Sequence, residues 1–140
     1  MKTILFLVIS FSLFFAPEVF SQKANEIEHF ESFLVKFKTD STFQKSRLIS
    51  PVIIIYSTGD LVETSDGLYE FALDTIQVKA EDWKFETLSF QAKVSEQVIN
   101  RIDGLIDYEI AGLNNGILVI YTFVTKDRKW YLKSYNNQST

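Results

Sequence analysis

The stretch "YTFVTKDRKWYLKSYNN", residues 121–137, contains two strands and the turn between them. Polar residues at 126–128 separate two runs rich in aromatic and β-branched side chains, the composition expected of strands joined by a tight turn. Upstream, Asn115-Gly116 is a strong signal for another hairpin turn, so a further strand precedes it. We therefore expect a three-stranded antiparallel meander that ends at Tyr135.

The middle strand of this meander is apolar on both faces. Successive side chains of a strand point to opposite faces. Both alternating sets are apolar here, with Ile117, Val119, Tyr121 and Phe123 in one set and Leu118, Ile120 and Val124 in the other. An antiparallel strand with two apolar faces normally has both of them covered. The pattern therefore predicts a homodimer packed sheet to sheet.

The strands upstream of the meander are less regular. A β-branched run at 52–56 predicts a strand, and turn-forming residues at 58–60 predict its end. Further on, the apolar positions change parity near Asp74 and Thr75, so a bulge there would keep them on the core face. A bulge bends a sheet, and a bent sheet has a concave face.

The middle of the chain carries mixed signals. Residues 80–83 predict a tight corner, and residues 86–94 alternate like a strand. Apolar side chains at 94–102 fit helical spacing as well as strand spacing, so a helix remains an alternative there. The alternation from 102 to 110 favours a strand.

The N-terminal third of the chain is expected to be helical. Apolar side chains recur there at helical spacing and form one stripe, which consists of Ile27, Phe30, Phe33, Leu34 and Phe37. Asn25 can cap the start of this helix. The stretch "STFQ" at 41–44 matches a capping box, in which Ser41 and Gln44 satisfy backbone N–H groups. It predicts a second helix at 42–48 that ends before Pro51.

The N-terminus has the features of a secretory signal peptide. Lys2 precedes an apolar run at 4–16, and cleavage after Ser21 would place small residues where the peptidase reads them. The apolar run is short for a transmembrane helix. We expect residues 1–21 to be a signal peptide and residues 22–140 to form a single periplasmic or secreted domain without a membrane anchor.

Composition excludes several classes of function. The chain has no cysteine, which excludes disulfides, thiolate nucleophiles, Cys-ligated metal and a lipid anchor on cysteine. Its net charge of -4 and the absence of a long basic stripe argue against binding to nucleic acid. Once the five Phe of residues 1–21 are set aside, eight Phe, six Tyr and two Trp remain, enough either to fill a core or to line a pocket.

Two helices followed by a curved sheet that ends in this stretch resemble the cystatin-like cone fold of the nuclear transport factor two superfamily. The last strand of that superfamily commonly reads "dGkWyl", and Lys129-Trp130-Tyr131-Leu132 matches it. Residues 33–51, "FLVKFKTDSTFQKSRLISP", resemble the secreted bacterial domain-of-unknown-function family 4348. The resemblance implies an α+β fold with N-terminal helices packed on a curved antiparallel sheet, and it implies no assigned activity. Residues 59–104 match weakly, and Arg128 stands where a hairpin glycine is commoner.

No catalytic motif occurs in the sequence, and neither a metal nor a cofactor is predicted. The sole histidine, His29, borders the apolar stripe of the first helix and is expected on the surface or rim. The densest acidic series consists of Asp60, Glu63, Asp66, Glu70 and Asp74. This series lacks the calcium-loop pattern, so we expect it to be a solvated hairpin edge. An enzyme that uses His29 or Asp74 inside the cone remains an alternative.

These observations favour a non-enzymatic binding module. Its ligand would be a small apolar or amphipathic molecule, or a protein partner, on the concave face of the sheet. The side chains favoured for a pocket combine an aromatic face with a polar tip, and they are Tyr56, Trp83, Tyr108, Tyr121 and Trp130. Core packing is the commoner role for each of them, so a dimeric scaffold protein with a filled core is a second alternative.

Overall fold

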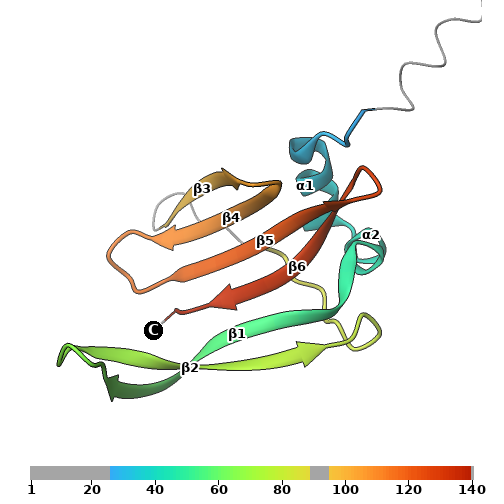
Figure 1. Cartoon of the computed structure of the whole chain (residues 1–140). Helices are drawn as coiled ribbons and strands as arrows, with labels where there is room; N and C mark the ends of the chain where they lie inside the picture. Colours follow the sequence, from blue (N-terminus) through green and yellow to red (C-terminus); the bar gives the residue numbers. More distant parts are fainter. Residues whose placement is uncertain (1–25, 89–94, 140) are drawn as a thin grey trace, which may run out of the picture.

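The computed structural model describes residues 26–88 and 95–139, and within them the chain forms two helices and six strands. In chain order the elements are α1 (Phe30–Thr39), α2 (Ser41–Ser46), β1 (Leu48–Glu63), β2 (Tyr69–Val78), β3 (Ser95–Ile102), β4 (Leu105–Gly112), β5 (Leu118–Lys126) and β6 (Lys129–Asn137). All six strands belong to one sheet with the order β2-β1-β6-β5-β4-β3 (Figure 1). The α+β class predicted from the sequence is confirmed.

The sheet is mixed rather than antiparallel throughout. β1 runs parallel to β6, whereas the other neighbouring pairs are antiparallel. The reason is that β1 follows α2 directly, and the end of α2 lies beside the start of β6. There the Leu132 N–H donates to the Arg47 carbonyl oxygen at 2.8 Å. Both strands leave the same end of the molecule in the same direction, so the prediction of a wholly antiparallel sheet is wrong for this pair.

β4, β5 and β6 form the predicted meander. The turn between β5 and β6 is made by Asp127 and Arg128, whose φ angles are 48° and 63°. Positive φ at both central residues is what a type I′ hairpin turn requires, and Arg128 adopts it in place of the glycine that is commoner there. β6 continues past the predicted end at Tyr135 to Asn137.

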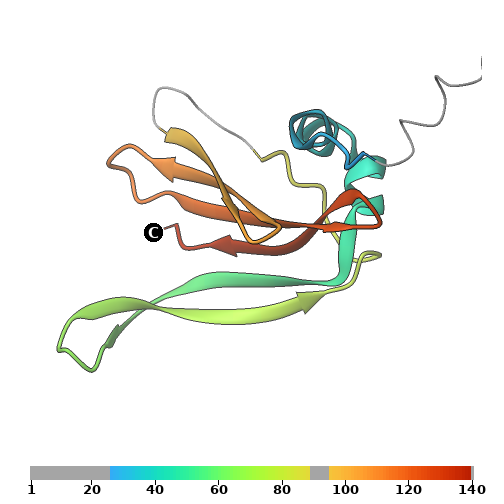
Figure 2. The same ribbon diagram turned by 45° about the horizontal axis from the view of Figure 1, so that its top comes forward.

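One face of the sheet is covered by α1 (Figure 2). Phe30, Phe33 and Phe37 of the predicted stripe are buried, and their ring centroids lie 5.4, 5.4 and 5.3 Å from that of Phe123 on β5. Burying a side chain of this size stabilises the fold by roughly 2 kcal/mol relative to leaving it exposed. Ile27, the first residue of the predicted stripe, precedes the helix and is exposed.

The helix starts differ from the prediction. α1 begins at Phe30 with His29 at the N-cap position, so it does not extend back to Asn25, which lies outside the described residues. α2 is capped by Asp40, whose carboxylate accepts from the Phe43 N–H at 2.9 Å. The predicted capping box is therefore wrong. Because Asp40 caps the helix, the side-chain amide of Gln44 is not needed for capping and can bond to other parts of the chain.

Gln44 is fully buried and bonds to two distant parts of the chain. Its Nε2 donates to the carbonyl oxygens of Phe37 and Glu86 at 2.8 and 2.7 Å. Its Oε1 accepts from the Trp83 indole N–H and the Glu86 N–H at 2.8 and 2.9 Å. The amide thus uses both donors and both acceptor sites of its side chain. It fixes residues 83–86, which follow the predicted corner, against the two helices.

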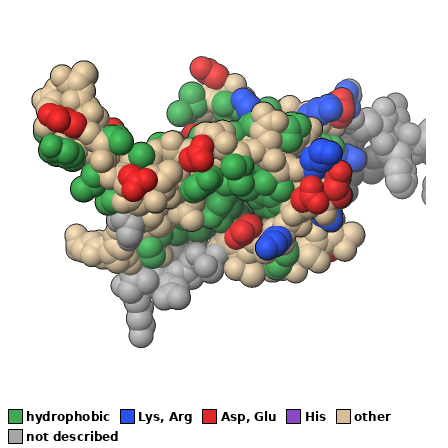
Figure 3. All heavy atoms as spheres, turned by 90° about the horizontal axis from the view of Figure 1, so that it is seen from below, with side chains coloured by type: hydrophobic (Ala, Val, Ile, Leu, Met, Phe, Trp, Pro, Cys, Tyr) green, Lys and Arg blue, Asp and Glu red, His purple; other side chains and the backbone are tan. Residues whose placement is uncertain are grey.

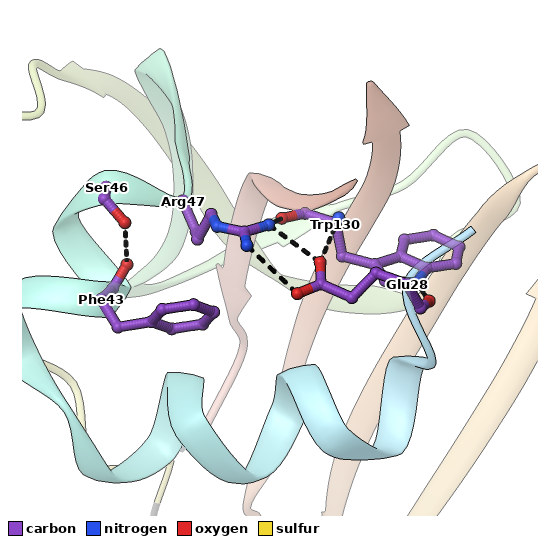
Figure 4. Close-up of polar contacts among 5 residues, drawn as sticks. All are labelled: Glu28, Phe43, Ser46, Arg47 and Trp130. Atoms are coloured by element: carbon purple, nitrogen blue, oxygen red, sulfur yellow. Dashed lines mark hydrogen bonds and ion pairs between the residues drawn. The ribbon is translucent and has the colours of Figure 1, made fainter. Parts of the chain in front are cut away.

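Arg47, directly after α2, fastens the start of α1 to β6 (Figure 4). Its guanidinium makes a two-pronged ion pair with Glu28 at 2.9 and 3.1 Å and donates to the Trp130 carbonyl oxygen at 3.2 Å. It also lies over the ring of Phe43, 4.7 Å from the centroid. Glu28 in turn accepts from the Trp130 N–H, and the Trp130 indole donates to the Glu28 carbonyl oxygen at 2.8 Å.

β1 is much longer than the predicted strand at 52–56. α2 ends at Ser46, and β1 then runs from Leu48 through Pro51 and through the predicted turn at 58–60. Pro51 is tolerated because the pairing of β1 with β6 is interrupted between Leu48 and Ile53. Residues 58–60 form a bulge opposite β2, with Gly59 at a φ of 84°.

This bulge replaces the one predicted near Asp74 and Thr75, which are regularly paired with Tyr56 and Ile55. The β1–β2 turn lies instead between the strand ends Glu63 and Tyr69.

The ambiguous middle of the chain is a hairpin. β3 pairs with β4 along its whole length, so the helical alternative for 94–102 is wrong. The turn uses Asp103 and Gly104, both with positive φ. The predicted corner at 80–83 is present as a turn. Residues 86–88 are not part of a strand, and the rest of the strand predicted at 86–94 lies outside the described residues.

We predict that Arg47→Met lowers the free energy of unfolding by about 3 kcal/mol, because the Glu28 carboxylate would remain partly buried without its cation. Urea unfolding followed by tryptophan fluorescence measures this loss. Arg47→Lys should recover only part of it, since an ammonium group cannot form the two-pronged pair. Adding Glu28→Gln to Arg47→Met should cost less than the sum of the two single changes; strict additivity would contradict the coupling.

We also predict that Gln44→Met lowers the free energy of unfolding by about 3 kcal/mol, because the N–H groups of Trp83 and Glu86 would lose their buried acceptor. Gln77→Met is the matched control on the exposed face of β2 and should change stability by less than about 0.5 kcal/mol. Similar unfolding curves for the two variants would show that the amide of Gln44 does not hold residues 83–86 in place.

Candidate binding site

Three tyrosines lie side by side across the face of the sheet that α1 covers in part. Tyr108 of β4 is the cross-strand partner of Tyr121 on β5, which is in turn the partner of Tyr135 on β6. The ring centroids are 6.2 Å apart in the first pair and 5.0 Å apart in the second. We call these three residues the tyrosine row. Strand pairing aligns them because each occupies a position of the same parity.

A cation lies at one end of the row. The Lys38 ammonium group of α1 donates to the Tyr108 hydroxyl at 2.6 Å and lies 4.2 Å from the centroid of its ring. Burial lowers the pKa of Lys38, because the charged form loses part of its hydration. Packing against α1 therefore closes this end of the row.

A carboxyl group lies at the other end. Glu86 is half-buried, and burial raises the pKa of its side chain. Its negative charge contributes to raising the pKa of Tyr121 and Tyr135, after burial as the main cause. Burial also raises the pKa of Tyr108 to about 12. All three phenols are therefore neutral near pH 7, and their hydroxyl groups can donate hydrogen bonds.

A cavity of about 220 Å³ opens beside the carboxyl end of the row. Its walls come from β1, β2, β6 and the segment after the corner, and the lining residues are Ile54, Val78, Asp82, Trp83, Lys84, Glu86 and Tyr135. Two aliphatic and two aromatic side chains line it together with three charged ones. The contacts of Gln44 hold the Trp83–Glu86 side of this cavity in place.

Two other depressions lie elsewhere on the surface. One of about 480 Å³ lies against α2 and is lined by Ser41, Thr42, Lys45, Ser46, Trp83 and Phe85. The other, of about 360 Å³, lies on β2 and is lined by Glu70, Phe71, Leu73 and Gln138. The polar residues of both are largely exposed and well hydrated. The cavity beside Tyr135 is the place where a partly desolvated charge meets aromatic rings.

The five residues predicted from the sequence do not form one site. Tyr108 and Tyr121 belong to the tyrosine row and are buried, and Trp83 lines the cavity. Trp130 lies at the far end of the same face, under α1, with its ring centroid 5.4 Å from that of Phe30. Tyr56 lies further along β1, where its hydroxyl donates to the exposed Asp74 carboxylate at 3.1 Å. That hydrogen bond raises the pKa of Tyr56.

Sequence reasoning missed Tyr135, Glu86 and Lys38. The face of the sheet to which Tyr135 points depends on a bulge in the pairing of β5 with β6, between Thr122 and Phe123. No Gly, Pro or other turn residue marks this bulge in the sequence. Glu86 reaches the site through the contacts of its backbone with Gln44, 42 positions earlier. Lys38 follows Phe37 of the stripe, and its position at the border of the apolar face could have indicated a side chain directed along the sheet.

The residues considered for catalysis lie outside the cavity. His29 is exposed, with its Nε2 3.6 Å from the Glu26 carboxylate on the outer surface. Asp74 lies on β2 and is exposed together with Asp60, Glu63, Asp66 and Glu70, which agrees with the solvated edge expected for this series. Within residues 26–88 and 95–139, no three His, Asp or Glu side chains are grouped as a metal site would need. No helix in this part of the chain is long and apolar enough to cross a membrane.

Comparison with known sequences gives no family. No protein-family model matches the chain, so the resemblance to domain-of-unknown-function family 4348 is not confirmed. No curated protein matches it either.

Solved structures show where the fold occurs. An NTF2-like protein from Bacteroides fragilis is similar to this chain with a TM-score of 0.55 and 20% sequence identity, over 83% of this chain and 49% of the other. The chain thus spans about half the length of that protein.

Two further NTF2-like proteins are more distant. The one from Cytophaga hutchinsonii has a TM-score of 0.42 and 11% identity, over 79% of this chain and 92% of the other. The one from Shewanella baltica, of unknown function, has a TM-score of 0.40 and 14% identity, over 76% of this chain and 87% of the other. The likeness to the Bacteroides fragilis protein shows the fold alone: an NTF2-like α+β domain, with two N-terminal helices and a six-stranded mixed sheet.

Proposed function

We propose that this chain is a non-enzymatic binding module whose ligand is a small amphipathic molecule with a positive charge. The observation that carries the proposal is the half-buried carboxyl group of Glu86 beside Tyr135 and Trp83, at a cavity of about 220 Å³. No hydrogen bond or ion pair to the Glu86 carboxylate is found among the described residues. A carboxylate held partly out of water, with no cation from residues 26–88 or 95–139 bonded to it, is a site for a cationic group.

The other walls of the cavity favour an organic cation over a metal ion. Aromatic rings attract cations through their π faces, and Tyr135 and Trp83 provide two such rings. Ile54 and Val78 provide apolar surface for the hydrocarbon part of a ligand. Asp82 and Glu86 together carry more negative charge than Lys84 offsets. The volume is below the roughly 300–1,000 Å³ typical of sites for drug-sized ligands, so the ligand or its bound group is small.

The non-enzymatic part of the proposal is supported by the positions of the two residues considered for catalysis. His29 and Asp74 are exposed and do not line the cavity. The signal peptide expected at residues 1–21 supports an encounter with the ligand in the periplasm or outside the cell. The alternative ligand, a segment of a protein partner with a basic side chain, would present the same chemistry to Glu86.

A second candidate function is that of a dimeric scaffold. The face of the sheet opposite α1, which no element of residues 26–88 and 95–139 covers and which we call the uncovered face, favours it. Leu118, Ile120 and Val124 of β5 point away from the helices and are only half-buried in the single chain. Ile53 and Ile55 of β1 lie on the same face. On the other face, Tyr108 and Phe123 are fully buried, as a filled core requires.

A charged residue flanks β5 on each side. Asp107 of β4 pairs with Thr122 of β5 and so shares the uncovered face, and the exposed Lys133 is the extra residue that the bulge of β6 inserts between Leu132 and Ser134. A twofold axis along β5 would place β4 of one copy over β6 of the other. Asp107 would then face Lys133 of the second copy, twice per dimer. This complementarity supports a second copy as the occupant of the uncovered face.

We predict that phenethylamine binds at the cavity and that phenylacetate, its anionic counterpart, does not. Titration followed by NMR shifts of the Trp83 indole and by calorimetry measures the binding. Glu86→Gln should weaken the binding at least tenfold because the carboxylate is lost. Glu81→Gln, an exposed change at the neighbouring corner, is the matched control and should leave it unchanged. Equal affinity for the two compounds, or for wild type and Glu86→Gln, would rule the proposal out.

The same Glu86→Gln variant should be more stable than the wild type at pH 7. Burial raises the pKa of Glu86, so the folded protein keeps this proton to a higher pH than the unfolded chain does. Stability from this group is therefore present at low pH and is lost as the pH rises from the ordinary carboxyl pKa through the raised one. Urea unfolding between pH 4 and pH 8 should show a smaller loss with rising pH in the variant. Parallel profiles would mean that the carboxyl group is well hydrated.

For the dimer, we predict that Lys133→Glu shifts the monomer–dimer equilibrium towards the monomer by about tenfold, since two like-charge contacts would form per dimer. Adding Asp107→Lys should restore dimerisation. Sedimentation velocity measures the equilibrium, and Lys36→Glu on α1 is the control for net charge. A monomeric wild type, or a double variant no better than Lys133→Glu, would exclude this interface.

A further inference from the structure

The distal part of the β1–β2 hairpin projects from the body of the protein (Figures 1 and 2). Tyr56 is the last residue of β1 that pairs with β6, so residues 57–73 form a two-stranded ribbon without a third strand. We call this ribbon the arm. Two-stranded hairpins are only marginally stable in water by themselves. The arm presents both of its faces to solvent, together with the edge formed by residues 69–73 of β2.

The arm is unusually apolar for a solvent-exposed ribbon. Six large apolar side chains on it each expose between 41% and 66% of their surface, namely Leu61, Val62, Leu68, Tyr69, Phe71 and Leu73. Figure 3 shows hydrophobic side chains on the projecting arm at the upper left, next to acidic ones. Exposed apolar surface of this kind marks an interaction site.

The charge on this hairpin has one sign. Between Leu48 and Val78, β1, β2 and their turn contain no Lys or Arg, and they carry five acidic residues, namely Asp60, Glu63, Asp66, Glu70 and Asp74. Lysine is the residue that most often protects an edge strand against pairing, and β2 also lacks proline. The 10-residue edge of β2 is thus open to another strand, provided that this strand is not acidic.

The side chains of residues 69–74 in β2 are sorted by face. Tyr69, Phe71 and Leu73 point to one face, and Glu70 and Asp74 point to the other, whereas beyond Asp74 the apolar Ile76 and Val78 follow the parity of the carboxylates. A strand added along residues 69–74 would meet apolar side chains on its first face and carboxylates on its second. The complementary sequence therefore alternates apolar and basic residues.

We propose that β2 binds an extended segment of a partner protein in which basic and apolar residues alternate, and that this segment adds a seventh strand to the sheet. Backbone hydrogen bonds along β2 would provide affinity, and the two faces would select the partner. A second copy of this chain fits the edge less well. Antiparallel pairing of two β2 strands about Ala72 would place Glu70 of one copy opposite Asp74 of the other, and like charges opposite each other destabilise a sheet.

The test uses a fluorescent peptide that matches residues 69–74 of β2 in length and in which Lys and Val alternate, with binding followed by fluorescence anisotropy. We expect saturable binding that is lost when Lys is replaced by Glu in the peptide. Binding should also be lost when alternate peptide nitrogens are methylated on the edge that faces β2, since this removes backbone donors and keeps the charge. Hydrogen exchange should show newly protected amides in β2 and none in β3, the other edge of the sheet.

Two matched variants separate edge pairing from general attraction of a basic peptide to an acidic protein. Glu70→Lys on β2 should weaken binding about fivefold, because an attractive cross-strand pair becomes a repulsive one. Glu96→Lys on β3 makes the same change in net charge at the opposite edge and should leave binding unchanged. The proposal is overturned by equal effects of the two variants, by undiminished binding of the methylated peptide, or by no saturable binding. It is also overturned if sedimentation of the protein alone shows self-association that Glu70→Lys alters.

Discussion

The guanidinium group of Arg47 is the contact on which the arrangement of the other elements depends. It is a cation with only 12% of its side chain exposed, and it is stable there because Glu28 and the Trp130 carbonyl oxygen replace the water it has lost. Through Glu28 it fixes the chain just before α1, and through Trp130 it fixes the start of β6. The phenyl rings of α1 are thereby held over Phe123, and β1 begins beside β6 and parallel to it.

The same corner determines the candidate site. α2 precedes Arg47 directly, so fixing Arg47 also fixes Gln44, which in turn binds the backbone of Glu86 and the indole of Trp83. No residue of α2 lines the cavity. The helix nevertheless positions two lining residues, Trp83 and Glu86, through Gln44. The carboxyl group that results is half-buried and works against stability at neutral pH. A partly buried carboxyl group that a satisfied buried network holds in place supports the proposal that this cavity binds a cationic group.

The distal part of the β1–β2 hairpin is held by backbone pairing alone, unlike the rest of the sheet. β3, β4, β5 and β6 are close in length, and the phenyl rings of α1 pack on β5, whereas β1 and β2 extend further and β1 has no β6 residue beside it beyond the Tyr56–Asn137 pair. The bulge at 58–60 lies where this support ends. Backbone pairing between the two strands keeps the arm formed, and its side chains contribute little to the core. They remain available for contacts with another molecule.

The sequence by itself determined the local structure of this protein. The hairpin at 126–128, the meander, the phenylalanine stripe of α1 and the burial of Tyr108 and Tyr121 follow from periodicity and turn chemistry, which act between near neighbours. The local prediction failed at Gly59 and at Asp40. The bulge at Gly59 shifts the alternation of β1, and Asp40 caps α2 in place of the predicted capping box.

Only the tertiary structure decided the parallel pairing of β1 with β6, the roles of Gln44 and Arg47 and the assembly of Glu86 with Tyr135. These contacts join residues far apart in the chain, up to 102 positions for Glu28 and Trp130. The strength of these contacts depends on two groups losing their water together, which happens only when the chain folds. No local pattern in the sequence therefore predicts them.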